Sequence, residues 1–238
     1  MSGSGAGETI TPRQDSVLSL SRQGFHRVAY TEWGDPASAK VVFCVHGLTR
    51  QGRDFDPLAM ALARRGYRVF CPDLVGRGRS DWLRDPDDYA LPQYATDMTV
   101  LLARTGVKSV NWIGTSLGAL VGMVVASQSA SPVRRMVVND IGPFVPHTAL
   151  HRLGLNLRAM PKRLANYEAA EAYFRDVLAP FGELDDAGWR LLTEHSIRRQ
   201  EDGSYRMLCD PGIARAFRPA LFYNVSMWRH WDAIEAPV

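Results

Sequence analysis

Cysteine is scarce in this sequence of 238 residues, and the three that occur are widely spaced. Cys44, Cys71 and Cys209 form no CxxC pair, so we expect neither a disulfide framework nor a structural zinc site. Cys44 and Cys71 lie inside apolar runs, where a free cysteine behaves as a small core residue. This usage is typical of a reducing compartment, and we therefore expect a cytoplasmic location.

Long apolar runs are also missing. No segment approaches the roughly 18 apolar residues that a membrane-spanning helix needs, so we expect no membrane partner. Residues 1–7 contain no basic stretch followed by an apolar stretch, which argues against a secretory signal. Residues 1–14 are interpreted as a flexible N-terminal tail.

Lysine is scarce as well, because all but three of the 28 basic residues are arginine. The net charge is only +3, and pairs such as Arg64-Arg65 and Arg134-Arg135 are scattered rather than gathered in a stripe. A nucleic-acid partner, which needs clustered positive charge, is not expected. The preference for arginine over lysine indicates a GC-rich bacterial genome.

Residues 15–143 alternate between strand and helix signals. Continuous apolar runs such as Val41–Val45 are typical of strands that are buried on both faces. Helical patterns of ten or more residues separate these runs, as between 91 and 104. The pattern predicts the α/β class: a mostly parallel sheet with helices on both faces.

The alternation of strand and helix signals ends after residue 143. Residues 144–231 hold helical patterns and many aromatic side chains but no strong strand run, so they predict a helical insertion that caps the sheet. Residues 232–238 are interpreted as the start of a return to the core.

One serine carries the strongest chemical signal. Ser116 stands between an apolar, strand-like run and a small-residue helix, with Gly114 and Gly118 two positions away on either side. Such a turn forces the serine into a strained conformation, and only small residues let the chain fold back around it. The serine hydroxyl is then exposed at a helix N-terminus, where negative charge is stabilised.

Four segments together resemble the α/β-hydrolase family, over almost the whole chain: His46-Gly47, residues 73–80, residues 114–118 and Asn139-Asp140. The resemblance implies an α/β-hydrolase fold with a helical cap, and it implies no cofactor and no metal. Ser116 would be the nucleophile.

The resemblance also implies supporting roles. The backbone N–H groups of Leu48 and Leu117 would form the oxyanion hole, and His46, Gly47, Gly114 and Gly118 would support that site. Asp140, at the end of a strand, is a candidate acid. For Arg50, Arg53, Arg77 and Arg79 we expect a solvated surface role rather than contact with an acidic substrate.

A serine nucleophile needs a general base, normally a histidine oriented by a carboxylate. In the family the acid and the histidine follow the cap, and none of the histidines present is a good substitute. We therefore expect this chain to be part of a longer hydrolase, truncated, processed, or completed by a second polypeptide that supplies the remaining strands and the catalytic His and Asp.

Three functions are weighed. The leading prediction is a serine hydrolase that cleaves a small carboxylic ester, or a thioester or lactone, through an acyl-enzyme on Ser116. The alternatives are a hydrolase of carbon–carbon bonds with the same fold and a ligand-binding protein without turnover. Leu48-Thr49-Arg50-Gln51 is not the glycine-rich stretch that often follows the His-Gly pair in carbon–carbon hydrolases, so that alternative ranks lower.

Overall fold

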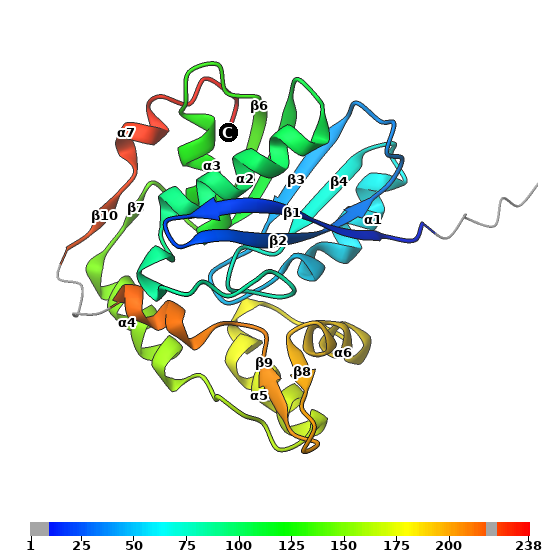
Figure 1. The fold of residues 1–238 in the computed structure, drawn as a ribbon, viewed down its shortest axis with the longest axis vertical. Helices are drawn as coiled ribbons and strands as arrows, with labels where there is room; N and C mark the ends of the chain where they lie inside the picture. The colour runs from blue at the N-terminus through cyan, green and yellow to red at the C-terminus, as the bar shows by residue number, and fades with distance from the viewer. Residues whose placement is uncertain (1–9, 218–222) are drawn as a thin grey trace, which may run out of the picture.

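The computed structural model describes residues 10–217 and 223–238, and its main feature is a six-stranded sheet (Figure 1). In spatial order the strands are β1 (Arg13–Ser21), β2 (Gly24–Trp33), β4 (Arg68–Pro72), β3 (Val41–Val45), β5 (Val110–Thr115) and β6 (Val133–Asn139). The last four are mutually parallel, whereas β1 and β2 form an antiparallel hairpin that joins the sheet through β4. The predicted α/β class with a mostly parallel sheet is confirmed.

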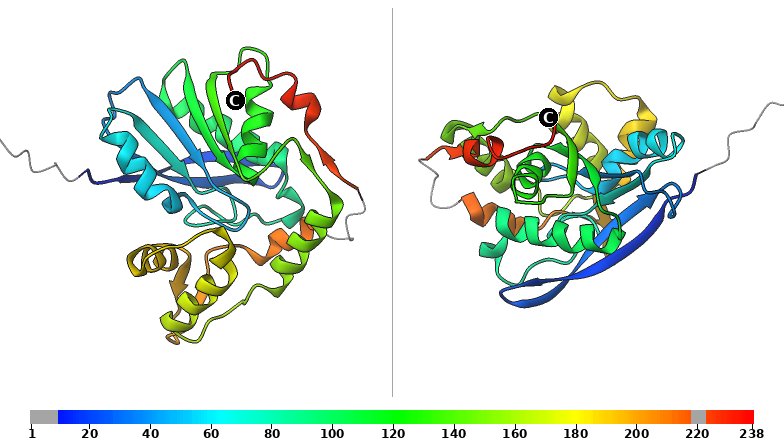
Figure 2. Two further views of the ribbon diagram at one scale, coloured as in Figure 1. Left: turned by 180° about the vertical axis from the view of Figure 1, so that it is seen from behind. Right: turned by 90° about the horizontal axis from the view of Figure 1, so that it is seen from above.

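The central strands are buried on both faces because their side chains alternate between two cores. On one face Phe43 stacks against Phe70 and Trp112, with ring centroids 5.4 and 5.8 Å away. On the other face Val42 and Cys44 belong to a second apolar cluster. The covering helices, seen from behind and from above in Figure 2, are α1 (Asp56–Ala63) on the Cys44 face and α2 (Leu91–Thr105) and α3 (Leu117–Ala126) on the Phe43 face.

The segment after β6 forms a further layer beneath the sheet in Figure 1, with an apolar cluster of its own around Phe174 and Trp189. Its helices are α4 (His147–Ala159), α5 (Tyr167–Leu178) and α6 (Asp186–Glu194). Two short strand pairs, which the sequence did not signal, accompany them: β8 (Ile197–Arg199) with β9 (Tyr205–Met207), and β7 (Phe144–Val145) with β10 (Val225–Ser226). Strands of two or three residues are too short for a periodicity to show.

Part of the segment assigned to the cap packs on the sheet domain instead. Ile213 and Met227 belong to the main core cluster, and His230 Nδ1 lies 2.8 Å from the hydroxyl of Ser127 at the end of α3. The short helices are η1 (Gly52–Phe55), η2 (Pro86–Asp88), η3 (Ala179–Phe181), η4 (Pro211–Phe217) and α7 (Trp228–Trp231). Ile213, Met227 and His230, all within the segment 144–231, therefore contact the sheet domain.

Both ends of the described chain contact the sheet. Residues 1–9 of the expected tail lie outside the described residues, and β1 already begins at Arg13, so the hairpin includes residues 13 and 14. At the other end the N–H of Met136 in β6 donates to Pro237 O at 2.9 Å, and the C-terminus lies beside β6 (Figure 1). Residues 232–238 thus run back to the outer strand of the sheet.

Across residues 10–217 and 223–238, no helix has the length and apolarity to cross a membrane. The same residues contain no group of three His, Cys, Asp or Glu side chains that could hold a metal ion. All three cysteines are free and buried, and Cys44 and Cys71 occupy the predicted core positions.

Candidate active site

Ser116 joins β5 to α3 in a backbone conformation that residues other than glycine rarely adopt. Its φ is 50° and its ψ is −113°, a state that costs about 1–3 kcal/mol and persists only where the surrounding structure fixes it. A Cβ on Gly114 would lie 2.5 Å from the backbone of α3, and one on Gly118 would collide with the carbonyl of Val45. The two glycines therefore let the chain fold back tightly enough to hold Ser116 at this turn.

The start of α3 adds a favourable electrostatic environment. Leu117 is its first residue, and the first N–H groups of any helix lack a helical carbonyl partner. The aligned peptide dipoles place partial positive charge at the same end. Ser116 itself is anchored, because its N–H donates to Asn139 O at 2.9 Å.

A turn of residues 47–50, here called the 47–50 turn, lies beside Ser116. It is closed by the N–H of Arg50, which donates to Gly47 O at 3.2 Å. Leu48 occupies the second position of this turn, so its N–H is not used to close it. A Cβ placed on Gly47 would lie 3.7 Å from Ser116 Cβ, which shows how closely the turn approaches the serine.

His46, at the base of this turn, is a neutral imidazole with both nitrogens engaged. Its Nδ1 lies 2.7 Å from Gly47 O and its Nε2 lies 2.9 Å from the N–H of Leu74, an arrangement that requires Nδ1–H to donate and Nε2 to accept. Burial, together with the positive charges of Arg77 and Arg50, lowers the pKa of His46 to about 3. A ring held in this way cannot take a proton from Ser116, so its geometry is that of a support for the turn.

Of the four arginines near these motifs, Arg77 is buried, whereas Arg50, Arg53 and Arg79 are partly exposed. Arg77 is 0% exposed, so the expectation of a surface role is wrong for it. The others form ion pairs with nearby carboxylates: Arg50 with Asp54, Arg53 with Asp56 and Arg79 with Asp73. No local sequence signal distinguishes Arg77, because two of its hydrogen-bond partners, Leu48 O and the Tyr94 hydroxyl, come from segments that are distant along the chain.

Asp140 lies next to the serine turn, since it follows Asn139, whose carbonyl accepts the N–H of Ser116. It is exposed and has a φ of 57°. Within the described part of the chain, no hydrogen bond joins Ser116 Oγ or Asp140 to a histidine. The remaining histidines are placed as follows: His26 pairs with Asp97, His230 with Ser127, His195 ends α6, and His147 and His151 lie on α4.

Residues 40–173 match the family model described as alpha/beta hydrolase fold. The chain belongs to this family. A 3-hydroxybutyrate-oligomer hydrolase from Cupriavidus necator is 43% identical over 97% of this chain and 80% of its own length. A bifunctional esterase/perhydrolase from Acinetobacter calcoaceticus is 30% identical over 54% of this chain and 46% of its own length.

The fold likeness extends over nearly the whole chain. A structure from Rickettsia typhi, described as a hydrolase, superposes with a TM-score of 0.85 at 28% identity, covering 95% of this α/β-hydrolase and 79% of the other chain. The predicted family is thus confirmed. Because the relatives are hydrolases and esterases, this α/β-hydrolase is an enzyme, and ester hydrolysis in general is the activity that they support.

Proposed function

We propose that this chain is a serine hydrolase that cleaves a small carboxylic ester through an acyl-enzyme on Ser116. The observation that carries the proposal is the strained backbone of Ser116 at the N-terminus of α3, held between two glycines that allow no side chain. Strain of this kind is retained at functional sites, where it fixes a reactive group in place. In the proposed reaction Ser116 Oγ attacks the ester carbonyl, the alcohol leaves, and water then releases the acid.

The N–H groups of Leu48 and Leu117 are proposed to bind the oxyanion that forms during the attack. The 47–50 turn approaches Ser116 closely, α3 begins at the residue after it, and the N–H of Leu48 is not used in closing its turn. Removal of one such donor costs on the order of 3 kcal/mol of transition-state stabilisation in other enzymes. His46, Gly47, Gly114 and Gly118 hold these donors in place.

The relative in Cupriavidus necator narrows the proposed substrate class. Its name states that it hydrolyses 3-hydroxybutyrate oligomers, and it shares 43% of its residues with this chain over 97% of the chain. We therefore place short-chain esters of hydroxy acids first among the carboxylic esters, ahead of thioesters and lactones.

A general base and an acid complete the proposal. Asp140 is the candidate acid within the chain, because it adjoins the residue that anchors Ser116. For the histidine we keep the hypothesis of a contribution from outside the described residues, from further chain or from a second polypeptide. The edge of β6, where Pro237 O already accepts the N–H of Met136, is where such a contribution would join the sheet.

The test is covalent labelling with a fluorophosphonate, followed by intact-mass measurement and peptide mapping. We expect one adduct on Ser116, none in Ser116→Ala, and an undiminished adduct in Ser127→Ala, which alters a serine at the other end of α3. An unlabelled wild-type protein that still binds hydroxy-acid esters would contradict the proposal and favour the ligand-binding alternative. A co-purified second polypeptide that is required for labelling would identify the source of the base.

A further inference from the structure

Arg77 is a fully buried charged side chain that the proposed chemistry does not use. Its exposure is 0%, and no carboxylate of the described residues lies within ion-pair distance of it. Its Nη2 has no hydrogen-bond partner, while its guanidinium carbon lies 5.0 Å from the ring centre of Tyr94 and 5.8 Å from that of Tyr89. A buried positive charge without a counter-ion is costly, so a function that requires it is expected.

The contacts of Arg77 lead to the 47–50 turn. Its Nε donates to Leu48 O at 2.8 Å, and its Nη1 donates to Val75 O at 2.8 Å and to the hydroxyl of Tyr94 at 2.7 Å. A planar guanidinium with three fixed partners has little freedom to move. Leu48 O is therefore held by a rigid donor.

The two peptide groups that flank the Cα of Leu48 are thus fixed from opposite ends. The preceding peptide, which contains the N–H of Leu48, is held where His46 Nδ1 donates to Gly47 O at 2.7 Å. The following peptide is held where Arg77 donates to Leu48 O. Because the backbone of Leu48 turns only about the bonds between these two planes, holding both fixes the direction of its N–H.

The charge of Arg77 also acts on this site. Besides burial, the positive charges of Arg77 and Arg50 lower the pKa of His46, so Arg77 contributes a positive potential at the base of the 47–50 turn. Such a potential in a buried environment favours an anion far more than it would in water. An oxyanion bound by Leu48 would experience the same potential.

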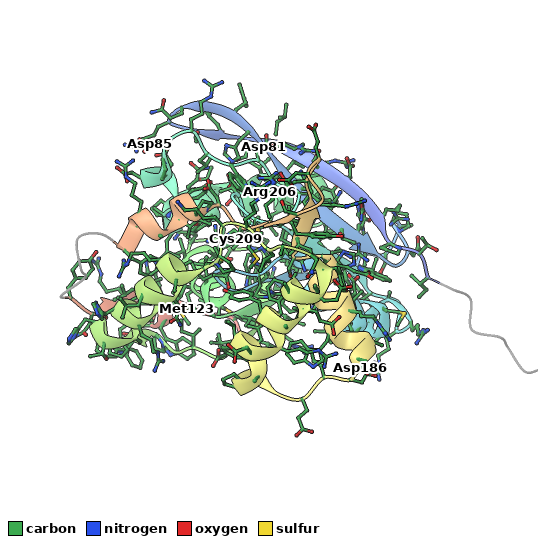
Figure 3. All side chains as sticks on the ribbon, turned by 90° about the horizontal axis from the view of Figure 1, so that it is seen from below. Asp81, Asp85, Met123, Asp186, Arg206 and Cys209 are labelled. Carbon is green, nitrogen blue, oxygen red and sulfur yellow. The ribbon has the colours of Figure 1, made fainter. Side chains whose placement is uncertain are left out.

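The loop that carries Arg77 is joined to the cap segment on both sides of the arginine. The N–H of Gly78 donates to Leu208 O at 2.8 Å, and the N–H of Asp210 donates to Gly76 O at 2.9 Å. Cys209 lies between these two hydrogen bonds and pairs with Arg77 in an isolated antiparallel β-bridge. Figure 3 shows Cys209 near the centre of the molecule. The backbone of Arg77 is therefore clamped between its own loop and residues 208–210.

We propose that Arg77 is the positioning residue of the oxyanion hole: it fixes the orientation of the Leu48 N–H through Leu48 O and adds a buried positive charge beside the developing oxyanion. The proposal rests on the proposed function of Ser116. This role differs from the surface role that the sequence predicts for Arg77. It also gives residues 208–210 a function, because they hold the loop that carries Arg77.

The test compares Arg77→Met, Arg77→Lys and the matched control Arg79→Met in the full-length protein. With p-nitrophenyl butyrate as substrate, we expect kcat of Arg77→Met to fall about tenfold to a hundredfold, since small misplacements of catalytic groups cost this much. KM should change less than about threefold. Arg77→Lys keeps the charge and should recover part of the loss. Arg79 contacts Tyr30 O and Asp73 rather than Leu48 O, so kcat of Arg79→Met should be unchanged.

An NMR measurement separates positioning from stability and needs no turnover. The Thr49 N–H shares its peptide with Leu48 O, so loss of the hydrogen bond from Arg77 should shift the Thr49 and Leu48 amide signals in Arg77→Met and leave them unchanged in Arg79→Met. Unchanged amide signals and an unchanged kcat in a folded Arg77→Met protein would overturn the inference. An inactive, unlabelled wild type would instead refute the role of Ser116, and the amide signals would still report whether Arg77 orients Leu48.

Discussion

The neutral state of His46 leads to a prediction about stability and pH. His46 is 1% exposed, and its two nitrogens are engaged in a pattern that only the neutral ring can satisfy. Its pKa falls from the ordinary 6.5 to about 3, mainly through burial. A group whose folded pKa is depressed contributes stability above its unfolded pKa and loses it as the pH falls towards the folded pKa.

The size of the effect follows from that shift. At pH 8 the imidazole is neutral in both states and makes no difference to folding. At pH 5 the unfolded chain binds a proton that the folded protein does not, and with a pKa of about 3 in the folded state this favours unfolding by about 2 kcal/mol. The loss continues to grow until the pH reaches the folded pKa.

Denaturant unfolding at pH 8 and pH 5 measures this difference in the wild-type protein and in His46→Gln, which cannot titrate. We expect the free energy of unfolding of the wild type to fall by about 2 kcal/mol more than that of the variant between the two pH values. The comparison removes the contributions of other groups, since they are common to both proteins. Equal pH dependence in the two proteins, or a His46 ring that titrates near 6.5 in an NMR experiment, would refute the reasoning.

Two further predictions concern packing and a second histidine. Gly118→Ala places a methyl group against the Val45 carbonyl and should destabilise the fold by about 1–3 kcal/mol in thermal unfolding and slow serine labelling, while Gly142→Ala, with open space at its Cβ, should do neither. For His26, burial lowers the pKa, but the hydrogen bond and the charge of Asp97 outweigh this effect, so the pKa is raised overall. The His26–Asp97 pair therefore stabilises the fold below pH 6.5, and this stabilisation is lost as the pH rises through the folded pKa of His26. Asp97→Asn should lower the NMR-measured pKa of His26 and should reduce the free energy of unfolding more at pH 5.5 than at pH 8.

The parts of the fold that the sequence predicts are those with a local physical cause. Five consecutive apolar residues at 41–45 are typical of a strand that is covered on both faces, and all five are buried. The turn at Ser116 is equally local, because the two glycines and the serine occur within five residues. The strands of the β8–β9 hairpin have three residues each, too few for a periodicity to show. The position of η4 depends on packing between distant segments, which no short window of the sequence contains.

The same division applies to the site. The 47–50 turn and Ser116 could be paired from the sequence through the resemblance, but the buried state of Arg77 could not. Arginine is seldom fully buried, and its burial here depends on the carbonyl of Leu48 and the hydroxyl and ring of Tyr94, which lie 29 and 17 positions away. A local pattern contains none of these contacts.

The 47–50 turn is where the sheet domain and the cap meet. His46 and Arg77 hold it from the sheet side, while Arg50 reaches the cap, donating to the hydroxyl of Ser196 at 3.1 Å and lying 5.5 Å from the ring centre of Phe174. A displacement of the cap would therefore act on the same turn whose N–H is proposed to bind the oxyanion. The contacts of Arg50 with Ser196 and Phe174 therefore link the segment after β6 to the turn beside Ser116.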